Sequence, residues 1–182
     1  MNRIIKTAAP EHLEKSLDLV EKVFTASEGA ESGRLVRSLV EEIRSKKFYV
    51  PQLDLVMVND KDEIIGYAMF SRFHLEGKYE NQLLLLSPVA VETKLQRQHI
   101  SKELIEEGFL RATGMGYEVV IVEGNPQNYN ARGFKTSCNY GIVASSQIGI
   151  PSVDCLMVKE LVNGSLKNFK GVVDYSDYQY LT

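Results

Sequence analysis

Residues 83–134 decide the fold of this chain and read LLLLSPVAVETKLQRQHISKELIEEGFLRATGMGYEVVIVEGNPQNYNARGF. The run Leu83–Val91 is apolar except for Ser87, and its length is typical of a strand that is buried on both faces. Pro88 lies inside this run. Because proline donates no backbone hydrogen bond, we expect a break or bulge here, with the backbone groups of residues 89–91 left unpaired with a neighbouring strand.

A polar loop at residues 92–98 leads from this strand into a predicted helix that begins near His99. Apolar residues recur at every third or fourth position of the helix, as expected for one buried face. These residues are Ile100, Leu104, Gly108, Ala112 and Met115. Gly114 and Gly116 would end the helix, because glycine adopts the left-handed conformation common at helix ends. Residues 117–122 then predict a second buried strand.

The junction between the loop and the helix has the features of an anion-binding site. The first turn of a helix offers free N–H donors and a partial positive charge. Three cations, Lys94, Arg97 and Lys102, surround this point in the sequence. An ordinary exposed loop would carry such charges too, but their position beside a helix start favours contact with a phosphate group.

The segments on either side of this stretch predict an α/β fold with a mixed sheet. The expected order is strand, two helices, three strands, helix, strand, short helix and two strands. Outside the central stretch, the strands are expected at residues 2–7, 53–58 and 63–73 and near 135–143 and 154–161. The helices are expected from Pro10 to Phe24 and from Leu35 to Ile43, with a loop at 25–33 between them. About seven strands and four helices would form a single domain spanning residues 1–182.

The composition of the 182 residues is that of a globular protein, with 44% hydrophobic and 25% charged residues. The net charge of −3 argues against an electrostatic role on nucleic acid or on an anionic membrane, so we expect neither as a partner. No apolar stretch has the length of a membrane span, and no signal-peptide pattern is visible. Cys138 and Cys155 lack metal-ligand spacing, and two free thiols in a reducing cytosol are favoured over one disulfide. A cytoplasmic protein without a metal site is therefore expected.

Two motifs in this chain resemble those of the GNAT superfamily of N-acetyltransferases, and more closely its bacterial cytosolic members. The first is QRQHIS at residues 96–101, which follows VAV at 89–91 and is similar to the family's Q/R-x-x-G-x-G/A loop. The second is NPQNYNARGF at 125–134, in which Tyr129 stands four residues before Gly-Phe, as in the family. The tail at 164–175 is similar to that of one bacterial subgroup. The resemblance therefore covers most of the chain.

The resemblance implies the GNAT fold, in which the fourth and fifth strands splay apart and receive the pantetheine arm of acetyl-CoA. It also implies acetyl-CoA as co-substrate, an amine as acceptor and no metal. Residues of the loop and of the neighbouring strand ends would contact the coenzyme. They are Val89, Ala90, Val91, Gln96, Arg97, Gln98, His99, Ile100, Ser101, Lys102 and Asn125.

Both glycines of the family's loop are replaced in this chain, by His99 and Ser101. Glycine lets the backbone come close to a pyrophosphate. Serine is small and donates a hydrogen bond itself, so the change at Ser101 is mild. We expect a helical φ at His99, which histidine adopts without strain, and expect its imidazole to cap or line the helix start rather than to take part in catalysis.

Acyl transfer from a thioester to an amine needs positioning, stabilisation of the oxyanion and movement of protons. Backbone N–H groups near residues 89–91 are candidates for binding the pantetheine and the thioester carbonyl. The departing thiolate needs a proton, and the resemblance makes Tyr129 its donor, with packing of this tyrosine against the sheet as the alternative. Asn125 would bond the pantetheine amide or stabilise the turn before Pro126.

No general base is assigned from the sequence. The run Leu83–Val91 contains no acidic residue, although the family commonly has one on this strand. Four residues in or beside loops are the remaining candidates, and a solvated surface position is expected for each. They are Glu28, Glu31, His74 and Glu76. The tail tyrosines alternate as in a strand, and they would form part of the acceptor pocket or a dimer contact. They are Tyr175, Tyr178 and Tyr180.

The sequence therefore predicts an acetyl-CoA-dependent N-acetyltransferase that acts on a primary amine of a small molecule or of a protein. A non-catalytic acyl-CoA-binding or regulatory module on the same fold is the alternative, since both loop glycines are replaced and no base is evident. A nucleotide-binding α/β protein is disfavoured, because the chain has neither a G-x-G-x-x-G motif nor a Walker loop. The identity of the acceptor stays open, and a homodimer is expected from the frequency of such assemblies.

Overall fold

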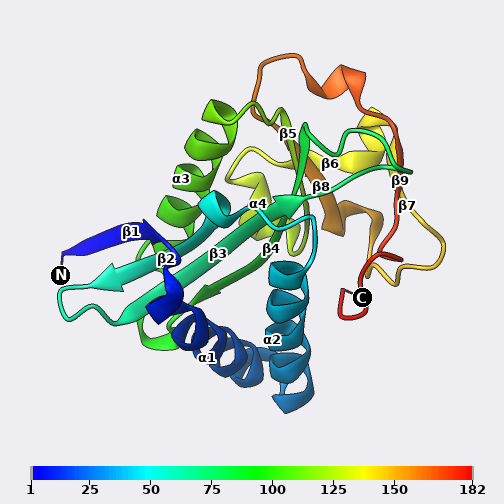
Figure 1. The fold of residues 1–182 in the computed structure, drawn as a ribbon. Helices are drawn as coiled ribbons and strands as arrows, with labels where there is room; N and C mark the ends of the chain where they lie inside the picture. Colours follow the sequence, from blue (N-terminus) through cyan, green and yellow to red (C-terminus); the bar gives the residue numbers. More distant parts are fainter. Residues whose placement is uncertain (1, 182) are drawn as a thin grey trace.

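A seven-stranded mixed sheet forms the centre of the computed structural model, which describes residues 2–181 (Figure 1). Its strands, in spatial order, are β1 (Arg3–Thr7), β2 (Asp54–Asn59), β3 (Ile64–Arg72), β4 (Leu83–Val91), β5 (Val119–Glu123), β8 (Leu156–Glu160) and β6 (Lys135–Thr136). The β4–β5 pair is parallel and the other neighbours are antiparallel. A second, two-stranded sheet pairs β7 (Ile142–Ala144) with β9 (Gly171–Val173). The predicted α/β class with a mixed sheet is confirmed.

Within residues 2–181, four α-helices cover the two faces of the sheet (Figure 1). Helices α1 (Pro10–Glu28) and α2 (Ala30–Ser45) pack on one face, and α3 (Ile100–Gly114) and α4 (Pro126–Asn130) lie on the other. Strand β4 supplies both cores, because its successive side chains alternate between the faces. Its leucines are fully buried, which explains why β4 is a continuous apolar run in the sequence.

The prediction of a loop at residues 25–33 is wrong. Helix α1 continues to Glu28 and α2 begins at Ala30, so Gly29 alone joins them, with φ 102°. Glycine adopts this angle without steric cost. The two helices also approach closely at Gly33, where a Cβ atom would lie 2.0 Å from Thr25 Oγ1. A polar segment rich in small residues is therefore a tight helix–helix junction here.

The end of the chain also differs from the prediction. The strand expected near residues 135–143 is divided into the two-residue β6, a 3₁₀ turn and β7, which belongs to the second sheet. The tail tyrosines do not form a strand. Tyr175 and Tyr178 are instead buried against the ring of Phe73. Met115, expected on the buried face of α3, is 43% exposed.

Strands β4 and β5 separate towards their carboxyl ends. Only Leu83–Leu85 of β4 pair with β5, opposite Val119–Ile121. On its other edge β4 shows a register shift against β3, because Ala68 faces Val89 whereas Phe70 faces Leu86. The extra β4 residue falls at the position of Pro88, as expected from its missing N–H donor. The predicted break in β4 is therefore confirmed on its edge with β3, and on the other edge the end of the β4–β5 pairing after Leu85 leaves an opening between those two strands.

Within residues 2–181, no helix combines the length and the apolar character that crossing a membrane requires.

Candidate functional site

A cavity of about 840 Å³ lies beside the opening between β4 and β5, next to the start of α3. This volume is near the upper end of the range for small-molecule sites. The cavity draws its walls from α1, β4, the loop before α3, α3 itself and α4. The lining residues are Val23, Val89, Val91, Gln96, Arg97, His99, Ile100, Ser101, Lys102, Ile105, Asn128, Tyr129, Ala131 and Arg132. Most of the residues predicted from the sequence are therefore brought together.

Predicted residues that do not line this cavity are Ala90, Gln98 and Asn125, and the cation Lys94 also lies outside its walls. The Oδ1 atom of Asn125 accepts a hydrogen bond from the backbone N–H of Gln127 at 2.9 Å, so this side chain stabilises the turn into α4. This is the second of the two roles predicted for it.

The backbone of β4 presents alternate peptide groups to the opening. The N–H of Glu92 donates to the carbonyl of Ile65 on β3 at 3.0 Å. Alternation along an antiparallel ladder then directs the peptide groups of Ala90 towards β3 and those of Val89 and Val91 towards the opening. The N–H groups at two of the three predicted backbone positions are thus available to a ligand, although the Val91 carbonyl accepts a hydrogen bond from Gln96 Nε2 at 3.5 Å, whereas Ala90 pairs with β3.

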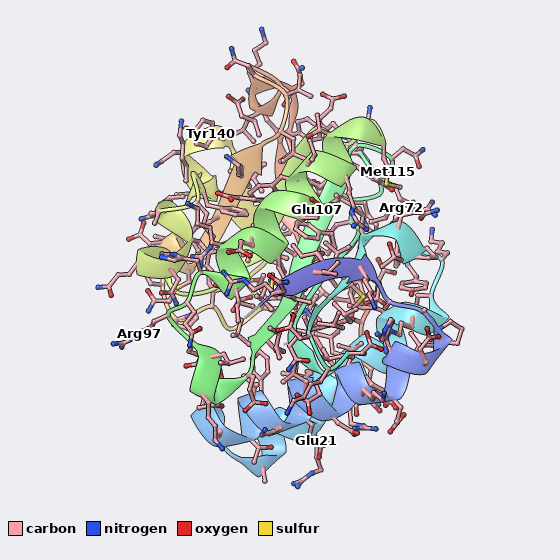
Figure 2. All side chains as sticks on the ribbon, turned by 90° about the vertical axis from the view of Figure 1, so that its left-hand side faces the viewer. Glu21, Arg72, Arg97, Glu107, Met115 and Tyr140 are labelled. Atoms are coloured by element: carbon pink, nitrogen blue, oxygen red, sulfur yellow. The ribbon has the colours of Figure 1, made fainter. Side chains whose placement is uncertain are left out.

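The loop before α3 contains two residues in the left-handed conformation, Arg97 with φ 62° and His99 with φ 64°. The prediction of a helical φ at His99 is wrong, because the chain turns sharply into α3 through this residue, which is the N-cap. Its imidazole forms no capping hydrogen bond and lines the cavity instead. His99 thus holds the backbone shape that glycine supplies most easily. Figure 2 shows the Arg97 side chain extending outward below α3.

A side-chain bridge joins α3 to the segment after α4. Arg132 Nη2 donates to Ser101 Oγ at 2.8 Å, and Arg132 Nη1 donates to the carbonyl of Asn128. The Nε atom of Arg132 is buried without a hydrogen-bond partner among residues 2–181. Arg132 is absent from the residues predicted from the sequence. Its charge within the NYNARGF run was the available signal, but only the folded chain brings it to Ser101.

Tyr129 contributes a phenol to the same cavity. Its ring packs edge-to-face on Phe134, with centroids 5.5 Å apart, and a Cβ atom at Gly124 would lie 2.5 Å from Tyr129 Cε2. Burial raises the pKa of Tyr129, and the nearby Arg132 guanidinium opposes this with a smaller effect. The phenol therefore keeps its proton at neutral pH. Packing and proton donation, predicted as alternatives, are compatible in this geometry.

The residues considered as bases from the sequence do not line the cavity. Glu28 accepts a hydrogen bond from Ser32, and His74 Nε2 lies 2.6 Å from Asp177 Oδ2. Glu76 accepts from the backbone N–H of Val172 at 3.4 Å. Across the described part of the chain, no group of three or more His, Cys, Asp or Glu side chains is arranged to hold a metal ion.

Comparison with known proteins agrees with this geometry. The family described as acetyltransferase (GNAT) matches residues 17–140. A relative from Escherichia coli strain K12, named as the uncharacterized N-acetyltransferase YhbS, is 27% identical over 141 residues, which cover 77% of this chain and 80% of YhbS.

Solved structures extend the comparison to the fold. The crystal structure of E. coli YhbS in complex with CoA has a TM-score of 0.83 at 24% identity, covering 94% of this chain and 88% of that one. A GNAT family acetyltransferase from Brucella melitensis, in complex with acetyl-CoA, has a TM-score of 0.63 at 26% identity, covering 74% of this chain and 83% of that one.

Proposed function

The chain belongs to the acetyltransferase (GNAT) family, and on that premise we propose that it transfers an acetyl group from acetyl-CoA to a primary amine of a small molecule or of a protein. The observation that carries the proposal is the cavity between β4 and α3, which joins free strand amides, a helix start and a buried phenol. The acetyl-CoA and CoA complexes of the two similar structures support this choice of co-substrate.

The residues of the cavity fit the coenzyme in charge and in hydrogen-bonding capacity. Its phosphates would lie at the first turn of α3, whose free N–H groups favour an anion. The cations Arg97, Lys102 and Arg132 border the same cavity. The peptide groups of Val89 and Val91 would bond the pantetheine arm, which carries amides of its own. The buried Arg132 Nε, which has no partner within the described chain, gives this anion site an unsatisfied donor.

The chemistry divides between the coenzyme and the protein. The coenzyme supplies an activated acetyl thioester. Strand amides at Val89 and Val91 hold the thioester arm and stabilise negative charge on its oxygen. Tyr129, kept neutral by burial, donates a proton to the departing sulfur. Arg132 and Ser101 fix the start of α3 relative to the segment that carries Tyr129.

Calorimetric titration of the protein with acetyl-CoA tests the proposal. We expect saturable binding that weakens at least several-fold in Arg132→Gln, because one cation is removed from the phosphate site. Lys135→Gln is the matched control, since Lys135 is an exposed cation that does not line the cavity. No heat of binding at millimolar acetyl-CoA, with a correctly folded protein, would contradict the assignment.

A non-catalytic acyl-CoA-binding module remains the second candidate function. The left-handed His99 and the Ser101–Arg132 bridge favour it, because both alter the loop at positions where the family has glycine. Measuring thiol release over a panel of primary amines separates the two functions. Turnover on any amine supports the enzyme, whereas binding of acetyl-CoA with no turnover supports the module.

The domain organisation, the cellular location and the oligomeric state are part of the same proposal. Two cores on opposite faces of one sheet support a single acetyltransferase domain over residues 1–182. A cytoplasmic location in a bacterium agrees with the free thiols of Cys138 and Cys155 and with the E. coli relative. A homodimer stays a prediction, to be checked by light scattering during size-exclusion chromatography.

A further inference from the structure

Glu123 ends strand β5 at the place where β5 leaves β4. The last β4–β5 pair is Leu85 with Ile121, so Glu123 lies two residues beyond the last pair that joins the two strands. Because side chains alternate along a strand, Glu123 shares a face with Ile121, which packs in the core under α1 and α2. Val122 points to the opposite face, where Tyr129 packs. The carboxylate and the phenol therefore lie on opposite faces of the sheet at one strand end.

Gly124 lies between these two side chains, since it follows Glu123 in the sequence and contacts the ring of Tyr129. Gly124 follows Glu123, and the Tyr129 ring lies against it so closely that a Cβ atom there would be 2.5 Å from Cε2. The N–H of Gly124 donates to the carbonyl of Cys155 at 2.9 Å, which fixes the strand end against the start of β8. The lining of the coenzyme cavity also includes Val23 of α1, so that cavity reaches the face on which Glu123 lies.

The carboxylate of Glu123 is held by a tyrosine and has no cationic partner. Tyr175 donates its hydroxyl to Glu123 Oε2 at 2.7 Å. None of the ion pairs found among residues 2–181 includes Glu123. Tyr175 is only 4% exposed and packs edge-on against Phe73. Burial and the neighbouring carboxylate raise the pKa of Tyr175, so it remains a donor. One carboxylate oxygen is thus fixed, and Oε1 is left for another ligand.

Glu123 also lines a second cavity, of about 440 Å³. Its walls are mainly apolar and come from the end of β5, the start of α4 and the segment before β8. They are Glu123, Gly124, Asn125, Pro126, Pro151 and Cys155. A ligand that fits here has an apolar body, because the prolines and the glycine backbone offer few polar partners. Because the Glu123 carboxylate forms no ion pair within the described chain, charge complementarity favours a ligand that carries a positive charge.

We propose that this second cavity receives the acceptor, a primary amine on an apolar body, and that Glu123 binds its ammonium group and removes a proton from it. The inference rests on the proposed acetyl transfer and adds the acceptor class and the base. Tyr175 is a positioning residue, since it acts through the carboxylate.

In the proposed acetyl transfer, every proton and every broken bond is accounted for by the residues and substrates named. Glu123 takes one proton from the ammonium and releases it to solvent. The neutral nitrogen then forms the new C–N bond while the C–S bond of the thioester breaks. The sulfur receives the Tyr129 proton, and the proton lost by the nitrogen on amide formation restores the phenol. The products are the acetylated amine, the free thiol and one proton.

The test compares Glu123→Gln with wild type, using phenethylamine as the apolar acceptor and glutamate as a polar, acidic one. Glutamine still accepts the Tyr175 hydrogen bond, so the fold is preserved while basicity is lost. We expect kcat/KM for phenethylamine to fall on the order of 100-fold, with unchanged acetyl-CoA affinity, and wild type to prefer phenethylamine over glutamate. Tyr175→Phe should lower kcat/KM several-fold and alter its pH profile, because the carboxylate loses its fixed donor.

Glu118→Gln is the matched control, because Glu118 precedes the same strand at its opposite end, about 17 Å from Glu123 at 3.3 Å per residue. Equal loss of activity in both glutamate variants, or activity of Glu123→Gln within threefold of wild type, would overturn the proposal.

Failure of the acetyl transfer itself gives a different result. If wild type binds no acetyl-CoA or turns over no amine, the proposed function fails, and phenethylamine binding is measured alone by thermal shift. Stabilisation of wild type but not of Glu123→Gln then still supports the acceptor site. An equal shift in both proteins, or none in either, overturns it.

Discussion

The left-handed conformation of His99 predicts that a glycine variant at this position is more stable than an alanine variant. At Ser101, inside the helix, the opposite order of stability is expected. His99 has φ 64° and ψ 8° at the N-cap of α3. A residue with a Cβ atom costs about 1–2 kcal/mol in this conformation, whereas glycine adopts it freely. His99→Gly and His99→Ala both remove the imidazole and differ only in the Cβ atom. Glycine is also more flexible in the unfolded chain, which lowers the free energy of unfolding of the glycine variant by about 0.5–1 kcal/mol. The glycine variant is therefore expected to be more stable than the alanine variant by about 1 kcal/mol in total.

Urea unfolding followed by circular dichroism measures this difference. About 1 kcal/mol corresponds to about 2–4 °C in Tm for a chain of this size. Ser101→Gly and Ser101→Ala supply the control, because Ser101 lies inside the helical turn and both changes remove the hydroxyl that bonds Arg132. There alanine should be the more stable by about 0.5–1 kcal/mol.

Coenzyme affinity extends the same comparison to function. Removing the side chain at His99 lets the loop backbone approach a phosphate, so His99→Gly should bind acetyl-CoA more tightly than His99→Ala does in calorimetry. An alanine variant as stable as the glycine variant would refute the reasoning, because His99 would then not be held in the left-handed region.

Three further outcomes are expected. Ser101→Glu should form an ion pair with Arg132 and repel the coenzyme phosphates, lowering acetyl-CoA affinity at least tenfold with little loss of stability; calorimetry showing affinity equal to that of Ser101→Ala would contradict this. Tyr129→Phe should lower kcat at least tenfold and leave acetyl-CoA affinity nearly unchanged, since packing on Phe134 is kept; equal turnover in steady-state thiol release would remove the phenol from the mechanism. The free energy of unfolding should fall as pH rises above about 10, because burial raises the pKa of Tyr67. The folded state then keeps a proton that the unfolded chain has already released. A urea midpoint that stays constant from pH 9 to 11 would count against this.

Local sequence rules predicted the fold well wherever the pattern of one segment reflected its burial. Leu83–Val91 is apolar on both faces because β4 lies between two helical layers, and Pro88 disrupted the pairing as its missing N–H requires. The rules failed where a neighbour in space set the conformation. The segment 25–33 was predicted to be a loop from its small polar residues, yet close contact of Gly33 with Thr25 makes it a helix junction.

The candidate site divides in the same way. The resemblance carried by QRQHIS and by Tyr129 before Gly-Phe directed attention to one cavity, and most of those residues line it. Arg132 and Glu123 were not predicted, because no periodicity links a cation after α4 to Ser101, or a strand-end carboxylate to a tyrosine 52 positions later.

The sequence by itself determined the order of strands and helices as far as α4, the break in β4 and the family, since each follows from side-chain pattern or backbone chemistry within a short segment. Only the tertiary structure decided which amides of β4 face the opening, the left-handed turn at His99 and the pairing of Glu123 with Tyr175. These features depend on strand register and on contacts between distant segments, and a linear pattern of residues carries no record of either.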